Sequence, residues 1–233
     1  NKILSICMYL LVLILVLIVF SHYLTREPFR LNNDKYKNYR LGDIIKGYIR
    51  KHEPKLYKEY PTKFKNTIAS DYIEMIKTEP IKDNNYHVLK KLCDRKKILN
   101  NDDIVIHLRL SDAIIGKKGS KYTFIKIFRS SLQPSDYKKL FKHIKKIKRV
   151  TIIYGFHHDK YNKKLTQNYI DDIKKIFTEK GVEVKEKISG DPDYDFCYMS
   201  QSKHFVMSGG GFSSFIAEVV KMNGNKVYSI KNL

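Results

Sequence analysis

The feature that most constrains the fold is a regular alternation of apolar strands with amphipathic helices, which begins near residue 102. Short β-branched runs that alternate with helical segments are typical of parallel sheets with crossover helices. The predicted strands are Ile104–Leu108, Val150–Tyr154, Val182–Ile188, His204–Ser208 and Lys226–Ile230. We therefore predict an α/β fold with a Rossmann-like parallel sheet over residues 101–233.

The segments between these strands carry the helical period. Asp136–Lys148 and Asn162–Lys180 each place aromatic and aliphatic side chains on one face and lysines on the other. A short helix is predicted to begin near Asp191-Pro192, and a last helix over Phe212–Met222. Sheets of this kind bind ligands at the carboxyl ends of their strands, so we expect functional residues there.

Residues 25–100 are lysine-rich and predict a small, mostly helical lobe. The prolines that divide this lobe into short pieces are Pro54, Pro61 and Pro80. Apolar residues at helical spacing predict helices over Thr67–Lys77 and Tyr86–Cys93.

Residues 1–24 predict a single membrane-spanning helix. The stretch Ile3–Phe20 has no charged side chain, and Ser21–Leu24 extend it to a length that crosses a bilayer. A cleaved signal peptide is the alternative, although its apolar core would be shorter and followed by small residues. The basic residues after the span favour a cytosolic domain, but large domains translocate regardless of flanking charge, so the orientation stays open.

The net charge of +21 is compatible with nucleic-acid binding, yet no nucleic-acid-binding motif accompanies it. Lys, Asn, Ile and Tyr are over-used together, and the lysines fall largely on solvated helix faces. We therefore expect no nucleic-acid partner, although such a field suits an anionic ligand or a membrane surface.

The cysteines Cys7, Cys93 and Cys197 are far apart in the sequence, and one lies in the apolar segment. This spacing predicts neither a disulfide framework nor a zinc site. The chain also lacks an Asn-x-Ser/Thr sequon, which agrees with a reducing compartment.

The first candidate motif, His107-Leu-Arg-Leu-Ser-Asp112, follows the first strand. The planar guanidinium of Arg109 has several N–H donors and suits a phosphate better than an ammonium does. Two alternatives stay open at this point: Arg109 pairs with an acid on the surface, and His107 is a hydrogen-bonded core histidine.

The second candidate motif, Ser208-Gly209-Gly210-Gly211-Phe212-Ser213-Ser214, joins the fourth strand directly to the last helix. It directs backbone N–H groups and the positive end of a helix at one spot, which suits an anion. Ser213 or Ser214 is expected to cap the helix or to donate to phosphate. It matches neither the Walker A loop nor the dinucleotide fingerprint, and a plain tight turn is the alternative.

A third cluster, His157, His158 and Asp159, follows the second strand and is placed to contact a base or ribose. Adjacent side chains rarely converge on one ion, so no metal site is expected here. Before the fourth strand, Asp195 lies in a short helix in which Phe196 and Met199 are expected to be core residues.

In this order and spacing, HLRLSD, the Asp195–His204 stretch and HFVMSGGGFSSFIA resemble the donor-binding half of the α1,2-, α1,6- and protein O-fucosyltransferases. That family carries a His-x-Arg-Arg-x-Asp motif, and later an acidic-hydrophobic-x-x-Met-Ser/Thr stretch that leads into Asn-Ser-Ser-Phe-Ser. The positions that fall on these motifs are His107, Arg109, Asp112, Asp195, Met199, Ser200, His204, Phe212 and Ser213. Residues 39–45 are faintly similar to the family's amino-terminal Gly-x-Leu-Gly-Asn stretch. Two departures stand out, since Leu110 replaces the second arginine and Gly209–Gly211 replace Asn-Ser-Ser.

The resemblance implies a GT-B fold with residues 25–100 on the acceptor side, transfer of fucose from GDP-fucose with inversion, and no metal cofactor. Arg109 would contact the β-phosphate, while Ser213 and the turn amides would hold the diphosphate. Together with the residues at the sheet edge, the expected catalytic set is Arg109, Asp112 and His157. The expected substrate-binding set is His107, Arg109, Asp159, Asp195, Ser208, Gly209, Gly210, Gly211, Phe212, Ser213 and Ser214.

The general base is left open among Asp112, His157 and Asp159, with Asp43 as a more distant candidate. Two hypotheses from other classes also stay open. One is a membrane-tethered module that binds a nucleotide-sugar without turnover, motivated by Leu110 and the short first lobe. The other is an electrostatic tether to nucleic acid or anionic lipid, motivated by the charge.

Overall fold

The computed structural model of the chain describes residues 41–78, 85–96, 98, 100, 102–110, 114–117, 120–124, 133–155, 163–188 and 190–233. The expected membrane helix over residues 1–24 lies outside these ranges, and so do Asp112, His157, His158 and Asp159. Within the described ranges, no helix is both long and apolar enough to cross a membrane.

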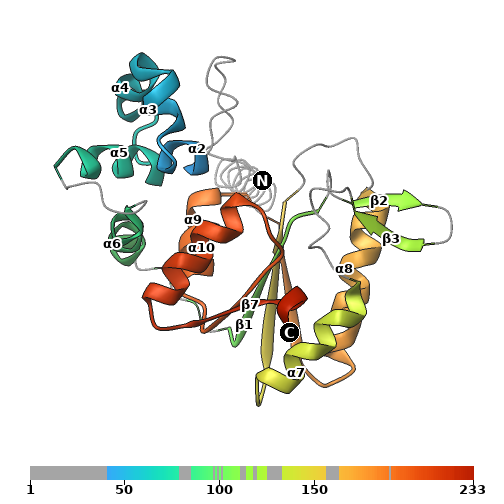
Figure 1. Cartoon of the computed structure of the whole chain (residues 1–233). Helices are drawn as coiled ribbons and strands as arrows, with labels where there is room; N and C mark the ends of the chain where they lie inside the picture. The colour runs from blue at the N-terminus through green and yellow to red at the C-terminus, as the bar shows by residue number, and fades with distance from the viewer. Residues whose placement is uncertain are drawn as a thin grey trace, which may run out of the picture. The chain divides into compact units, whose positions relative to one another are not determined.

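The centre of the fold is a parallel sheet of five strands in the order β5-β4-β1-β6-β7 (Figure 1). The strands are β1 (Ile104–Leu108), β4 (Arg149–Tyr154), β5 (Glu183–Ile188), β6 (His204–Met207) and β7 (Lys226–Ser229). Each lies within one residue of its predicted bounds, which confirms the predicted α/β sheet. In register, Ile106 pairs with Ile152 on one side and with Val206 on the other.

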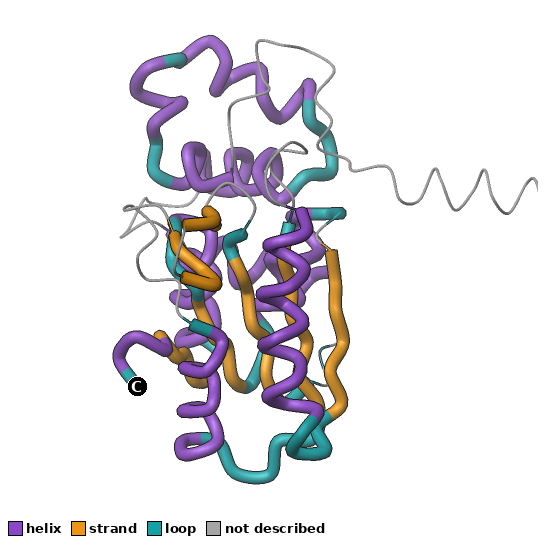
Figure 2. Tube along the Cα trace, turned by 90° about the vertical axis from the view of Figure 1, so that its right-hand side faces the viewer, coloured by secondary structure: helices purple, strands orange, loops and turns teal. Residues whose placement is uncertain are grey.

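Helices cover both faces of this sheet (Figures 1 and 2). One face carries α8 (Lys163–Thr178), the 3₁₀ helix η4 (Pro134–Lys139) and α7 (Leu140–His143). The other face carries α9 (Pro192–Ser200) and α10 (Gly211–Met222). The predicted helices 162–180, 191 onward and 212–222 are therefore confirmed, and Gly181 ends the first of them at a φ of 72°.

The predicted helix 136–148 is wrong in its second half. The chain leaves the helix at Ile144, which is extended (φ −122°, ψ 114°), and Lys146 takes a positive φ of 58°. Ile144 is nevertheless buried in the core, and Ile147 packs against it. The apolar spacing was correct, but an extended segment satisfies it as well as a helix does.

An antiparallel hairpin that the sequence analysis did not predict lies between β1 and η4. It consists of β2 (Ile114–Lys117) and β3 (Ser120–Phe124). Tyr122 fixes it to α8, because its hydroxyl donates to Asp172 at 2.6 Å and its ring meets Tyr169 edge-on at 5.2 Å.

The described part of the first lobe is helical, as predicted, and packs on α9 and α10 (Figure 1). Its helices are α2 (Leu41–Ile45), α3 (Tyr48–His52), α4 (Pro54–Lys63), α5 (Ile68–Thr78) and α6 (Tyr86–Lys96). Ile49, Tyr60 and Leu89 are fully buried within it. A polar contact also joins the lobe to the sheet domain, since the carboxylate of Asp193 on α9 accepts the backbone N–H of Ile68 at 2.6 Å.

The prediction of no disulfide is wrong. Cys93 on α6 and Cys197 on α9 form a disulfide across 104 residues of sequence, with Cα atoms 5.0 Å apart. Both cysteines are buried where the two helices pack together. Sequence separation therefore gave no measure of their separation in space.

Candidate functional site

The two motifs singled out in the sequence lie side by side, because β1 and β6 are neighbours in the sheet. From β1 the chain builds β4 and β5 on one side, and then returns to place β6 and β7 on the other. The strand order thus reverses between β1 and β6. In open α/β sheets, the crevice outside the carboxyl ends of the strands at such a reversal is where ligands bind.

The turn after β6 is built for close backbone approach. Gly209 has a φ of 95°, and Gly210 has a φ of 85° with a ψ of 161°, conformations that glycine adopts far more readily than other residues. Helix α10 then begins at Gly211, and no side chain caps it. Its first internal hydrogen bond runs from Ser214 N to Gly210 O at 3.2 Å. The N–H groups of residues 211–213 therefore point out of the helix end, where a dipole of positive sign favours an anion.

Two serines of the turn bind the end of β1. The Ser208 hydroxyl accepts the Arg109 backbone N–H at 2.8 Å, and Ser213 Oγ shares a 2.5 Å hydrogen bond with Nδ1 of His107. Ser213 is fully buried, so its hydroxyl orients the imidazole. Ser214 is exposed, and its hydroxyl donates to the Gly210 carbonyl at 3.0 Å. Neither Ser213 nor Ser214 caps α10, so the capping alternative is wrong.

Arg109 runs along the glycine turn. A Cβ atom built on Gly210 would lie 3.6 Å from Cδ of Arg109, which places the arginine stem directly against the turn. The next residue, Leu110, is 1% exposed and belongs to the hydrophobic core, so it adds no polar group to the site.

Lys46 is a residue that the sequence analysis missed. It follows α2 directly, and its Nζ lies 3.8 Å from the place a Cβ would occupy on Gly211. The same Nζ is 5.8 Å from the ring centroid of Phe215 on α10. The only local signal was its position one residue after the 39–45 stretch, because its approach to the turn depends on how α2 packs.

An aromatic ring packs against the imidazole of His107. Phe212 meets the His107 ring edge-on at 5.6 Å and packs on Phe196 at 5.9 Å. Phe196 and Met199 are fully buried, which confirms both as core residues.

Two residues carried over from the resemblance bind partners outside the turn. Asp195 is fully buried and forms an ion pair with Lys187, with Nζ and Oδ1 2.5 Å apart. His204 is the first residue of β6, at the opposite end of the strand from the turn, and bonds to the Tyr228 hydroxyl at 3.1 Å. Burial lowers the pKa of His204.

Metal-ligating side chains and cavities are the other places where a ligand could bind. Among the described residues, no cluster of three His, Cys, Asp or Glu side chains is arranged to hold a metal ion. A cavity of about 390 Å³ lies away from the turn, where residues of β3, η4 and α8 line it, including Tyr122, Pro134 and Asp172.

Comparisons with known proteins add little. No family model matches the chain, and no curated protein matches it. Among solved structures, it is similar to a crystal structure of POFUT1 with GDP-fucose (14% identity, TM-score 0.37), covering 60% of this chain and 47% of that one. A POFUT1 structure with GDP gives 13% identity and a TM-score of 0.38, covering 64% and 50%. The chain thus spans about half the length of these structures, and at such scores neither assigns a function to it.

Proposed function

We propose that the chain is a glycosyltransferase that binds a nucleotide-sugar at the β1/β6 edge and transfers the sugar, fucose from GDP-fucose, to a hydroxyl of a glycan or protein. One observation carries this proposal. Arg109 and the uncapped amino end of α10 meet at the point where the strand order reverses. The order of the sequence motifs supports the choice of donor.

In the proposed reaction the acceptor oxygen forms a bond to the anomeric carbon while the bond from that carbon to the β-phosphate oxygen breaks. The electron pair stays on the departing diphosphate, and the acceptor proton passes to a general base. Arg109 and the N–H groups of 211–213 stabilise the charge that develops on the diphosphate. Attack from the face opposite the leaving group inverts the sugar, and no metal is needed where fixed donors carry this charge. Asp112, His157 and Asp159 remain the candidates for the base.

The His107–Ser213 hydrogen bond adds a positioning element. It joins the carboxyl end of β1 to the first turn of α10. The positions of Arg109 and the helix amides are therefore fixed relative to each other. Preorganised donors of this kind cost no reorganisation when charge develops, which is why they lower a barrier.

The test uses the full chain in detergent solution, titrated with GDP- and UDP-sugars and assayed for slow donor hydrolysis. We expect saturable binding that Arg109→Ala weakens by about 10- to 100-fold, since hydrogen bonds to charged groups contribute about 1.5–3 kcal/mol. Arg50→Ala, a change of equal charge at an exposed position on α3, is the control and should leave binding unchanged. Loss of binding in both variants, or in neither, would exclude the proposed site.

A second candidate function is a module that binds a nucleotide-sugar without turnover. The buried Leu110 and the three glycines favour it, because they leave one arginine and backbone amides as the donors. Binding that depends on Arg109, without hydrolysis or transfer across a panel of glycans, would select this function over the transferase.

We further propose that residues 1–24 anchor the chain in a membrane and that the folded domain faces an oxidising compartment. The Cys93–Cys197 disulfide supports this orientation, since disulfides persist chiefly outside the cytosol. Thiol alkylation of cells lysed directly into denaturant tests it, because both cysteines are buried in the folded chain. Full labelling of Cys93 and Cys197 without reductant would place the domain in a reducing compartment.

A further inference from the structure

Three positive groups from separate parts of the chain surround the glycine turn. Arg109 follows β1 directly, the helix end belongs to α10, and Lys46 follows α2 of the helical lobe. Among the described residues, no ion pair joins Lys46 to a carboxylate. An exposed ammonium beside the positive amino end of a helix is repelled by the helix dipole, and an anion bound there would remove that repulsion.

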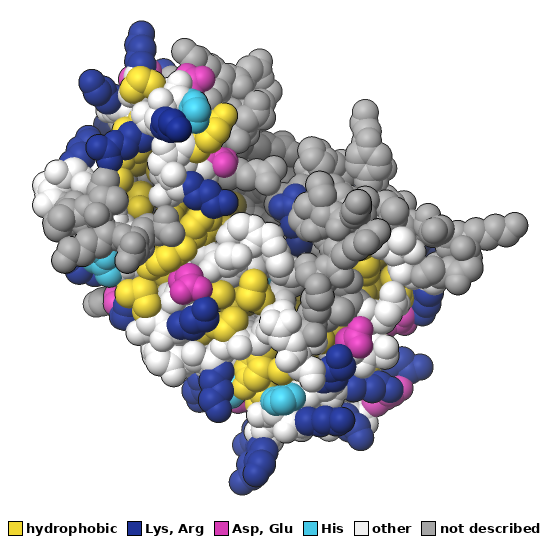
Figure 3. All heavy atoms as spheres, viewed as in Figure 1, with side chains coloured by type: hydrophobic (Ala, Val, Ile, Leu, Met, Phe, Trp, Pro, Cys, Tyr) yellow, Lys and Arg dark blue, Asp and Glu magenta, His cyan; other side chains and the backbone are white. Residues whose placement is uncertain are grey.

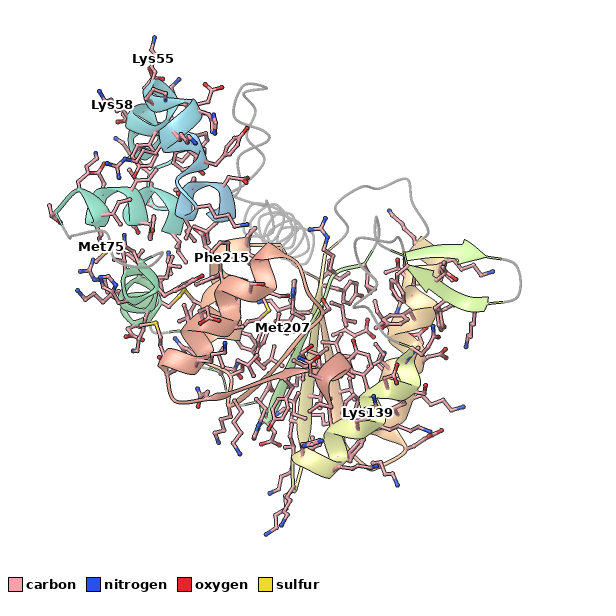
Figure 4. All side chains as sticks on the ribbon, viewed as in Figure 1. Lys55, Lys58, Met75, Lys139, Met207 and Phe215 are labelled. Carbon is pink, nitrogen blue, oxygen red and sulfur yellow. A yellow bond between two sulfur atoms is a disulfide. The ribbon has the colours of Figure 1, made fainter. Side chains whose placement is uncertain are left out.

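Packing holds Lys46 in this place. Leu41, Ile44 and Ile45 anchor α2 in the lobe's core, and Gly42 lies against α10. A Cβ on Gly42 would lie 3.0 Å from Cε2 of Phe215, so a larger residue at position 42 would require the Phe215 ring or α2 to shift. Figure 4 shows Phe215 on the side of α10 that faces α2. The close contact of α2 with the first turns of α10 brings the next residue, Lys46, to Gly211.

The second arginine of the family motif is absent here, since Leu110 is buried in the core. The segment that follows β1 therefore supplies one cation, Arg109, while a nucleoside diphosphate presents two phosphate groups. We infer that Lys46 supplies the second cation from the other lobe and binds the second phosphate, so that the site prefers nucleoside diphosphates to monophosphates. This inference rests on the proposed function and names the ligand class and the residue that selects it.

The high net charge of the chain does not by itself account for two cations beside the glycine turn. On the face shown in Figure 3, Lys and Arg side chains are spread over several elements and interspersed with acids, whereas Lys46 and Arg109 contact adjacent glycines. Lys46 belongs to the helical lobe and Arg109 to the sheet domain. A diphosphate bound by both therefore bridges the lobe and the sheet, so α2 should become more protected from hydrogen exchange when ligand binds.

The experiment measures the affinities of the full chain, in detergent solution, for GDP and GMP. We expect Lys46→Ala to weaken GDP binding by about five- to tenfold and GMP binding by less than about twofold. Lys46→Arg, which keeps the charge, should retain the preference. Lys58→Ala is the matched control, because Lys58 is exposed on α4 at the far end of the lobe (Figure 4).

Gly42→Ala tests the placement of Lys46 without a change of charge. Its Cβ should push α2 from α10 and reduce the ratio of GDP to GMP affinity, with the thermal unfolding transition reporting whether the fold is kept. An unchanged ratio in Lys46→Ala, or an equal loss in Lys58→Ala, would overturn the inference while the proposed function stands, provided Arg109→Ala still weakens binding. If wild-type chain binds neither nucleotide, both the proposed function and the inference fail.

Discussion

Replacing Asp193 with asparagine tests how the helical lobe is joined to the sheet domain. The carboxylate is buried and accepts the N–H of Ile68, the first residue of α5, at 2.6 Å. Burial raises the pKa of Asp193 from 3.8 to about 6. The Ile68 N–H and Lys96 oppose this rise, and the charges of Asp191 and Asp71 add to it.

The sign of the pH dependence follows from this shift. Between about pH 4 and 6 the folded state holds a proton at Asp193 that the unfolded state has lost, so the free energy of unfolding falls as pH rises. A rise from 3.8 to about 6 corresponds to about 3 kcal/mol, at about 1.36 kcal/mol per pKa unit. Asparagine keeps an acceptor for Ile68 and carries no charge. Asp193→Asn should therefore be more stable than wild type by up to about 3 kcal/mol at pH 8, and differ little at pH 4.

Urea unfolding followed by circular dichroism, at intervals from pH 4 to 8, measures this difference. Asp94→Asn, which removes an exposed carboxylate on α6, is the control and should show no comparable pH-dependent gain. A wild-type-minus-variant difference that does not change between pH 4 and 8 would refute the reasoning. So would a variant less stable than wild type at pH 8.

Three further perturbations follow from the same structure. The double variant Cys93→Ala/Cys197→Ala should have a free energy of unfolding about 2–5 kcal/mol below that of wild type. A wild-type urea midpoint that reductant leaves unchanged would contradict this. Gly210→Ala forces a non-glycine residue to a φ of 85° and should lower the free energy of unfolding by about 1–3 kcal/mol. It should also weaken GDP binding. A variant as stable as wild type and with equal affinity would rule out the described turn. Ser213→Ala removes the partner of His107 and should cost about 1–2 kcal/mol and reduce donor affinity, whereas Ser214→Ala, at an exposed neighbour, should change neither.

The sheet was predictable because its strands are short apolar runs between strongly periodic helices. The pattern gave β1, β4 and β5 within one residue of their bounds. The hairpin of β2 and β3 had a readable signal that was not used, since Lys-Gly stands in the sequence between two strand-like runs. The end of α7 at Ile144 had none, because the apolar positions suit both conformations.

Two features of the structure, one at the site and one away from it, depend on tertiary packing and leave no local pattern in the sequence. Lys46 reaches the glycine turn because α2 packs on α10, where Gly42 lies against Phe215. The Cys93–Cys197 pair forms only because α6 packs on α9. By contrast, the sequence predicted that Arg109 and the 208–214 turn lie at the same edge of the sheet, since both follow strands directly. The structure adds that these two strands are neighbours.

The binding of a GDP-sugar to the full chain, compared between wild type, Arg109→Ala and Arg50→Ala, tests the central claim most directly. The site described here predicts saturable binding that falls by about 10- to 100-fold in Arg109→Ala alone. Equal affinity in all three proteins, or a loss shared by both variants, would contradict a diphosphate site at the β1/β6 edge.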